Sequence, residues 1–408
     1  MGKRYDRAVA ERKRTTARRL RRKHYGDQPS PVMDAANIHY DVSRKTHALN
    51  CGGIGAVHQM VQKIGLAGDL NNRLNLLKFH VPYHESDHVL NIAYNVMAGG
   101  MRLGDIGIRR GDEVFLNALG AERLPDATTA GDFTRRFSEA DILELMEAVN
   151  DSRRRVWRMR GRGMLKEALI DVDGTIAPTC GERKGGMDIS YNGVWGYHPL
   201  VVSLANTGEI LYLVNRPGNC PSHQGAAEWI DRAIALVGEA AERICVRGDT
   251  DFSLTANFDR WSGEADFVFG MDAMPVLKNI AESLREGEWV PLGRTGARTP
   301  GRARRRPENV RDRIVAERGY RNIRLVSEDV AEFRYRPGKC ERDYRMVVVR
   351  KNLSVERGES VLFDDIRYFF YITTREDLDA AGVVALAAGR CNQENVIEQL
   401  KNGVNAMR

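Results

Sequence analysis

The segment ALIDVDGT at residues 168–175 constrains the fold more than any other part of the chain. Its apolar run ends in two aspartates, Asp171 and Asp173, and a turn-forming Gly-Thr pair follows at once. A buried strand that presents a carboxylate at its carboxyl end is typical of α/β folds. A second strand of this kind, ICVRGDTDF at residues 244–252, ends in Asp249. The two segments therefore predict an α/β core with acidic side chains at the ends of two strands.

The elements between and beside these strands indicate how the core is connected. Leu165–Val172 is the first strand, and Asn206–Gly208 is a tight turn between two further strands. A helix is expected over Ala226–Ala241, directly before the second acidic strand. Three antiparallel strands, then a helix, then a parallel strand is the order of an RNase H-like core. We therefore expect an α/β, RNase H-like catalytic domain over residues 161–408.

A third carboxylate, Glu394, lies near the end of the chain on a helix expected over Asp377–Leu400. The long gap between Asp249 and Glu394 contains segments rich in β-branched and aromatic residues, which predict a small antiparallel sheet. These segments are Glu332–Tyr335, Tyr344–Arg350 and Ile366–Thr373. We interpret this sheet as a β-rich insertion, over about residues 275–375, that interrupts the core.

The N-terminal part of the chain has a different pattern. Residues 31–160 are expected to be mainly α-helical, because apolar positions recur every three or four residues. The repeat is clearest in Gln59–Leu66, Val89–Met97 and Ile142–Val149. Leu124–Phe137 is interpreted as a capped turn entering a helix that carries Arg135 and Arg136. We expect this region to bind DNA through these arginines, with a plain scaffold as the alternative.

The charge of the chain points to a polyanionic partner. The net charge is +7 with a sequence pI near 9.1, and the excess is clustered. Eleven basic residues between Lys3 and Lys23 predict a disordered arm over residues 1–30, which would contact DNA phosphates or only aid solubility. The stretch RTGARTPGRARRR predicts an exposed loop whose guanidinium groups hold a DNA backbone. The arginines assigned to this contact are Arg298, Arg302, Arg304, Arg305 and Arg306.

Other classes of protein and site are disfavoured by the sequence. The six cysteines include no C-x-x-C pair, which argues against a zinc knuckle or a disulfide framework. No apolar stretch reaches ~18 residues and the N-terminus is charged, so we expect a cytoplasmic protein without a membrane partner. His84 and His88 share a helix face, but Pro82 separates His80 from them. We favour structural or capping histidines over a metal site there.

The acidic residues themselves predict a metal site. Carboxylates close together repel one another unless a cation neutralises them. Oxygen ligands favour Mg²⁺ or Mn²⁺. Two such ions about 4 Å apart activate a water or a 3′-hydroxyl and stabilise the leaving oxygen of a phosphoryl transfer. This chemistry would cut and join DNA.

The chain resembles the DDE transposases of bacterial insertion sequences, in the IS4-like group and most closely the IS1380 family. The resemblance rests on DVDGT at 171–175, on RGDTDF at 247–252, and on the spacing R-x3-E-x6-K near the end. It extends to HVPYHESDHVLNIAYNVMAGG and LPDATTAGDFTRRF. The resemblance implies catalytic, metal-binding roles for Asp173, Asp249 and Glu394, and supporting roles for Arg390 and Lys401.

The sequence departs from the family pattern in two places. The tyrosine of the family signature is replaced by Ala387, and the chain stops fourteen residues after Glu394, where relatives continue. A truncated copy that only binds DNA is therefore one alternative. Asp171 and Asp251 also remain alternative ligands, since residues two apart on a strand point the same way.

Two other enzymes use similar motifs. DVDGT also matches the nucleophile motif of haloacid dehalogenase-like phosphatases, but no lysine lies between Lys184 and Lys278, where that fold needs one. A hydrolytic RNase H-like nuclease would share the metal chemistry and use water as its nucleophile. We favour a transposase that cuts at terminal inverted repeats and joins 3′-hydroxyl ends to target DNA. It would act as a homodimer on double-stranded DNA in a bacterial, nucleoid-associated setting.

Overall fold

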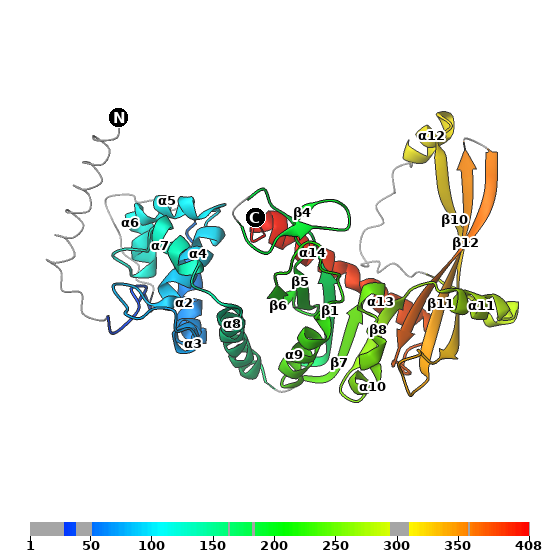
Figure 1. Cartoon of the computed structure of the whole chain (residues 1–408), viewed down its shortest axis with the longest axis horizontal. Helices are drawn as coiled ribbons and strands as arrows, with labels where there is room; N and C mark the ends of the chain where they lie inside the picture. The colour runs from blue at the N-terminus through cyan, green and yellow to red at the C-terminus, as the bar shows by residue number, and fades with distance from the viewer. Residues whose placement is uncertain are drawn as a thin grey trace. The chain divides into compact units, whose positions relative to one another are not determined.

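The computed structural model describes residues 28–37, 51–161, 164–181, 184–293, 310–357 and 360–407. The chain forms two compact units, one drawn mainly from residues 1–159 and the other from residues 160–403 (Figure 1). Within the described ranges, no helix combines the length and the apolar character needed to cross a bilayer.

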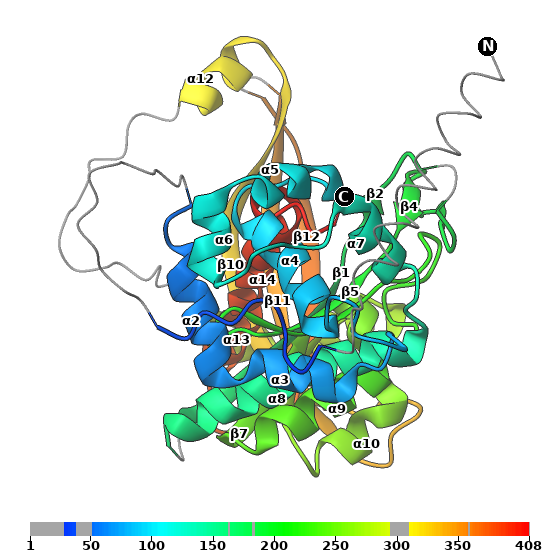
Figure 2. The same ribbon diagram turned by 90° about the vertical axis from the view of Figure 1, so that its left-hand side faces the viewer.

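The first unit is helical. Its helices are α2 (Ile54–Ile64), α3 (Leu66–Arg73), α4 (Glu85–Met97), α5 (Ile106–Arg110), α6 (Glu113–Leu119), α7 (Ala127–Thr134) and α8 (Glu139–Met159), with a 3₁₀ turn at Leu103–Asp105. α3 and α8 lie side by side (Figure 2). Buried side chains such as Leu70, Leu90, Tyr94 and Phe115 form one core. Many of the apolar positions predicted every three or four residues contribute to this core, whereas Met97, Ile142 and Val149 are exposed.

Two sequence expectations in this unit are wrong in detail. The helix expected over Gln59–Leu66 is broken at Gly65, whose φ of 78° is left-handed and ends α2. α7 begins as expected, because the Asp126 side chain accepts the Thr129 N–H at 2.8 Å. It ends at Thr134, whose hydroxyl bonds the Gly131 carbonyl, so Arg135 and Arg136 lie after the helix and not on it.

The second unit is built on a large mixed sheet. Its strands are β1 (Leu165–Gly174), β2 (Ala177–Pro178), β3 (Asp188–Ile189), β4 (Trp195–Tyr197), β5 (Leu200–Leu204), β6 (Glu209–Val214), β7 (Ala241–Gly248), β8 (Asp266–Met271), β9 (Val290–Pro291), β10 (Arg321–Tyr335), β11 (Tyr344–Arg357) and β12 (Ser360–Thr373). Its helices are α9 (Ala226–Gly238), α10 (Phe258–Trp261), α11 (Pro275–Ser283), α12 (Val310–Glu317), α13 (Ala380–Ala388) and α14 (Asn392–Glu398).

The order of the strands places β1 and β7 next to each other at the centre. The nine-stranded sheet runs β6-β5-β1-β7-β8-β12-β11-β10-β9, and β2, β4 and β3 form a separate small sheet. β6, β5 and β1 are antiparallel neighbours, whereas β1, β7 and β8 are parallel. This agrees with the connection order expected from the sequence. Asp171 on β1 stands opposite Arg247 on β7.

The β-rich segment differs from the small sheet expected there. β10, β11 and β12 have 15, 14 and 14 residues and form a long ribbon (Figure 1). β12 pairs with β8, with Phe370 opposite Met271. The ribbon therefore continues the core sheet instead of forming a sheet of its own. The reason is that β8 would otherwise leave its backbone hydrogen-bonding edge unpaired.

Helices cover both faces of the sheet. Val383 of α13 packs on one face with Cys245 and Val268 in a buried cluster. Phe267 and Phe269 alternate with Val268 along β8 and stack on Phe258 of α10 at the other face. α9 packs on β1, β5, β6 and β7. The central strands are thus buried on both sides, which explains their nearly continuous apolar runs.

The final helix begins later than expected and is interrupted. α13 starts at Ala380, where Asp379 accepts the Gly382 N–H at 2.7 Å. A 3₁₀ turn at Gly389–Cys391 separates α13 from α14, and a π turn at Gln399–Gly403 follows. A side chain at Gly389 would come within 2.7 Å of the Arg247 guanidinium. Glycine is therefore required where the chain passes Arg247, although it weakens a helix.

Candidate active site

Asp173 and Asp249 lie at the ends of two neighbouring parallel strands. Asp173 is the next-to-last residue of β1, and Asp249 directly follows β7. Because parallel strands end at the same edge of a sheet, the two side chains share one site. Asp249 also accepts the Asp251 N–H at 3.0 Å and so starts a short 3₁₀ turn. The local sequence thus places both carboxylates where the backbone leaves the sheet.

Arg390 bridges the two carboxylates. Its Nη1 atom lies 3.1 Å from Asp173 Oδ2 and its Nη2 atom 3.8 Å from Asp249 Oδ2. Burial raises the pKa of Asp173 to about 6, with Arg390 lowering it and the nearby Asp249 raising it. Burial also raises the pKa of Asp249, against the charge of Arg390. The site is therefore a partly buried acidic pair that needs positive charge beside it.

Asp171 forms an ion pair with a different arginine, Arg247. Its two oxygens accept hydrogen bonds from Arg247 Nε at 2.6 Å and Nη2 at 2.8 Å, and both side chains are buried. Burial raises the pKa of Asp171 and the Arg247 charge opposes that rise. Arg247 also donates to the Leu386 carbonyl in α13. This ion pair ties β1, β7 and α13 together, so Asp173 is the carboxylate of DVDGT that faces Asp249 and Arg390.

Glu394 stands apart from the aspartates. It lies in the first turn of α14, one helical turn after Arg390, and is exposed. Among the described residues, the trio Asp173, Asp249 and Glu394 is not gathered within 4.8 Å. Lys401 is partly buried in the π turn, and its pKa is lowered by burial and raised by Glu398. The structure therefore brings Arg390 to the two aspartates and leaves Glu394 at the surface.

Gln393, which the sequence analysis did not single out, fastens this helix to the core. Its side-chain amide donates to the carbonyls of Asp171 at 3.0 Å and Val201 at 3.1 Å. The side chain is buried, in the residue just before Glu394. Nothing in the local sequence distinguishes Gln393 from the exposed residues beside it on the helix. Its partners are more than 190 positions away.

His198 was also missed and lies directly against β1. Its Nδ1 is 2.7 Å from the Cys220 carbonyl, and a Cβ on Gly174 would come 2.6 Å from its Nε2. Arg216 donates from Nε to the His198 carbonyl at 3.0 Å and from Nη1 to carbonyls of the loop after β6. The glycine that follows Asp173 is therefore required by the close approach of a buried ring.

The sequence from residue 47 to residue 408 matches the family model described as Transposase DDE domain, group 1. The chain belongs to the DDE transposase family. The match covers both units and supports a DNA transposase, in a family that generally uses divalent metal ions. The phosphatase alternative is set aside by this finding. No curated protein matches the chain.

One solved structure similar to this DDE family member is the cryo-EM structure of the piggyBac transposase synaptic complex with hairpin DNA. The similarity has a TM-score of 0.34 and 8% sequence identity, and covers 84% of this chain and 67% of that chain.

The two aspartates suit the metal ions of a DDE transposase by their donor chemistry. Asp173 and Asp249 offer only carboxylate oxygens, which are hard ligands. Their mutual repulsion is balanced by a single guanidinium, Arg390. A divalent cation would neutralise the pair more fully. The residues present therefore fit such a group.

The three histidines His80, His84 and His88 lie away from this site, in the helical unit. His80, His84 and Glu85 bring ligand atoms within 4.8 Å of one another. Glu85 Oε1 accepts two backbone N–H groups and Oε2 meets His80 Nε2 at 3.1 Å, while His84 Nε2 lies 2.8 Å from the Gln28 carbonyl. His88 is buried against Phe133. These contacts support structural roles, which the sequence analysis favoured.

The expected DNA-binding arginines divide into two groups. Arg135 and Arg136 are exposed after α7, where Arg135 pairs with Asp132 at 2.8 Å and Arg136 donates to the Leu76 carbonyl at 3.2 Å. The basic arm Lys3–Lys23 lies outside the described residues. So do Arg298, Arg302, Arg304, Arg305 and Arg306.

Proposed function

We propose that the protein is the transposase of a bacterial insertion sequence, in the IS4-like group and closest to the IS1380 family. It would cut DNA at terminal inverted repeats and join the 3′-hydroxyl ends to target DNA. The observation that carries the proposal is the pair Asp173 and Asp249 at the ends of adjacent parallel strands, bridged by Arg390. The strand order and the buried Asp171–Arg247 pair support an RNase H-like catalytic core.

Asp173, Asp249 and Glu394 would hold two Mg²⁺ or Mn²⁺ ions. Bound there, the ions supply a nucleophilic oxygen and stabilise the leaving oxygen of the phosphoryl transfer. Arg390 compensates the charge of the aspartates and would also contact a DNA phosphate. Gln393 holds the turn that carries Glu394 against β1. Lys401 would contact DNA phosphates together with Arg390.

The remaining parts of the chain would hold the DNA. Residues 31–160 form the DNA-binding region, with Arg135 and Arg136 on its exposed surface. The arm at residues 1–30 and the basic stretch at 294–306 would add contacts to the phosphate backbone. Joining two element ends requires a synaptic complex, for which a homodimer is the simplest assembly.

The test is cleavage and strand transfer on a labelled duplex that carries the element's own ends, with Mg²⁺. Asp173→Asn, Asp249→Asn and Glu394→Gln are each expected to abolish both products while DNA binding remains. Asp251→Asn is the matched control, since Asp251 is an exposed neighbour of Asp249 and should keep activity. Wild-type cutting without joined products would instead identify a hydrolytic nuclease. Full activity in any of the three variants would refute the catalytic role assigned to the substituted residue.

A further inference from the structure

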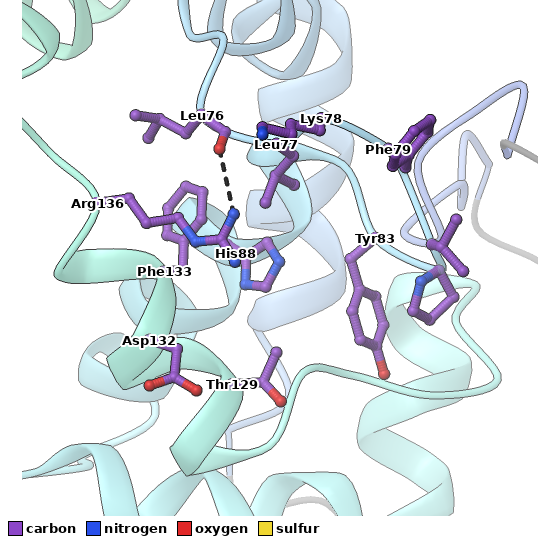
Figure 3. A pocket seen from close by; sticks show the side chains of 12 residues that line it. Leu76, Leu77, Lys78, Phe79, Tyr83, His88, Thr129, Asp132, Phe133 and Arg136 are labelled. Carbon is purple, nitrogen blue, oxygen red and sulfur yellow. Dashed lines mark hydrogen bonds between the residues drawn. The ribbon is translucent and has the colours of Figure 1, made fainter. Parts of the chain in front are cut away.

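A cavity in the helical unit lies outside the candidate active site. Its volume is about 850 Å³, in the range of sites that bind small organic molecules. Its walls come from the loop Leu76–Tyr83, from α4 and from α7 with the residues after it (Figure 3). The two segments HVPYHESDH and DATTAGDFTRR, which were noted in the sequence, therefore meet at one site.

The walls of this cavity are aromatic. His88 stacks on Phe133 with 4.3 Å between ring centroids and an angle of 8° between the planes. Tyr83 meets His88 edge to face at 5.7 Å. Phe79 also lines the cavity and is 74% exposed. His88 and Phe133 are themselves nearly inaccessible, so the exposed ring of Phe79 is the one open to stacking. Exposed aromatic rings bind nucleobases of any sequence by stacking.

His88, one of the residues that line the cavity, has a buried polar atom without a partner. His88 is only 4% exposed, and its Nδ1 has no hydrogen-bond partner among the described residues. Burial lowers the pKa of His88 to about 4, helped by the charge of Arg136, so the ring is neutral at pH 7. A neutral imidazole nitrogen donates or accepts according to its tautomer. A ligand with a hydrogen-bonding edge satisfies this atom, whereas an apolar side chain leaves it unpaired.

Positive charge surrounds the aromatic walls. Lys78 and Arg136 line the cavity and are exposed. Burial raises the pKa of Tyr83, and the nearby Arg123 and Arg110 lower it. The acidic lining residue Asp132 is already paired with Arg135 at 2.8 Å. This combination suits a planar base attached to a phosphate.

We infer that this cavity receives an unpaired nucleotide of the bound DNA, with its base stacked on Phe79 and hydrogen-bonded to His88. Arg136 and Lys78 hold the adjoining phosphates. A paired base inside a duplex cannot reach such a site, so the nucleotide is extruded or lies in a single strand. The inference rests on the proposed function, since it assumes that this unit contacts DNA. The inference adds that the helical unit prefers DNA with an unpaired nucleotide over a fully paired duplex.

The test compares two DNA molecules of one sequence, a fully paired duplex and the same duplex with a single bulged 2-aminopurine. Anisotropy measures the affinity of the full chain for each, and 2-aminopurine fluorescence reports stacking of the bulged base. We expect the bulged DNA to bind about tenfold more tightly, because stacking contributes that order of affinity. The bulged base should also be quenched on binding.

Thr129→Trp fills the cavity, and Thr128→Trp is the matched control because Thr128 is exposed and does not line it. The preference for bulged DNA should disappear in Thr129→Trp and persist in Thr128→Trp. It should weaken in His88→Phe, which keeps an aromatic ring but removes the ring nitrogens. Circular dichroism checks that each variant folds. Equal affinities for both DNAs, or a preference that survives Thr129→Trp, would overturn the inference and leave the proposed function intact. Binding of neither DNA would overturn the proposed function itself.

Discussion

The side-chain amide of Gln393 donates a hydrogen bond to the backbone carbonyl of Asp171, with 3.0 Å between nitrogen and oxygen. The same amide reaches the Val201 carbonyl on β5. Asp171 and Val201 lie on neighbouring strands, so one buried side chain binds α14 to two strands beside Asp173. This contact decides where the Glu394 turn lies relative to the sheet.

Replacing Gln393 should therefore impair catalysis more than DNA binding. We expect Gln393→Ala to lower strand transfer at least tenfold and the free energy of unfolding by about 1–2 kcal/mol, since two hydrogen bonds to buried carbonyls are lost. Strand-transfer assays and urea unfolding measure the two effects. Asn392→Ala, at the exposed preceding position, is the control. A Gln393→Ala protein with normal activity would show that the Glu394 turn is held by other contacts.

Asp171 and Asp173 should respond differently to the same substitution. Asp171→Asn leaves Arg247 buried without its carboxylate, and we expect a loss of about 3–5 kcal/mol in the free energy of unfolding. Asp173→Asn removes a carboxylate that is desolvated and repelled by Asp249, so stability should be unchanged or higher. Thermal unfolding in the absence of divalent ions distinguishes the two. Equal Tm values for both variants would contradict the division of roles.

The raised pKa of Asp173 predicts a specific pH dependence of stability. The pKa is about 6 in the folded chain, against a reference value of 3.8. Between these values the folded state binds the proton and the unfolded state does not, so the free energy of unfolding falls as pH rises. Without metal, stability should decrease from about pH 4 to 6 by an amount that Asp173→Asn removes. Urea unfolding at several pH values measures this loss of stability. Identical pH profiles for the wild type and Asp173→Asn would disprove the raised pKa of Asp173.

The same proton competes with a divalent ion. Below pH 6 the apparent affinity for Mn²⁺ should fall about tenfold per pH unit, because one carboxylate must lose its proton before it binds. Titration calorimetry at pH 5, 6 and 7 would measure this slope. An affinity independent of pH in this range would mean that Asp173 does not hold the ion.

Gly174 should not tolerate a side chain. A Cβ there would approach His198 Nε2 to 2.6 Å, and the ring is held from its other side by the Cys220 carbonyl. We expect Gly174→Ala to displace the end of β1, with lower stability and a severe loss of cleavage. Adding His198→Ala removes the obstructing ring and should recover part of the stability, which thermal unfolding would show. If the double variant is destabilised by the sum of the two single effects, the clash is not the cause.

The strands, turns and helices that the sequence predicted depend on residues close together in the chain. The apolar runs that end in Asp173 and Asp249, the turn between β5 and β6 and the helix before β7 follow from residues within a few positions of one another. The functional role of Arg390, Glu394 and Lys401 came from the family resemblance and stays a prediction. An arginine within the buried strand ICVRG was also visible, and its need for a buried partner could have identified the Asp171 pair.

Other features depended on distant parts of the chain. The sheet expected at residues 332–373 proved to be continuous with the core sheet, because β12 pairs with the hydrogen-bonding edge of β8. The last helix is interrupted at Gly389, where Arg247 comes close. Neither partner is near in sequence, so hydrophobic pattern and turn residues carry no information about them.

The sequence by itself determined which segments become strands and helices and which carboxylates end the central strands, because these depend on local side-chain pattern and backbone preference. Only the tertiary structure decided what each charged group does. It pairs Asp171 with Arg247, places Arg390 between Asp173 and Asp249, and leaves Glu394 exposed. The physical reason is that burial makes an unpaired charge costly, so each buried carboxylate takes the cation that folding brings to it.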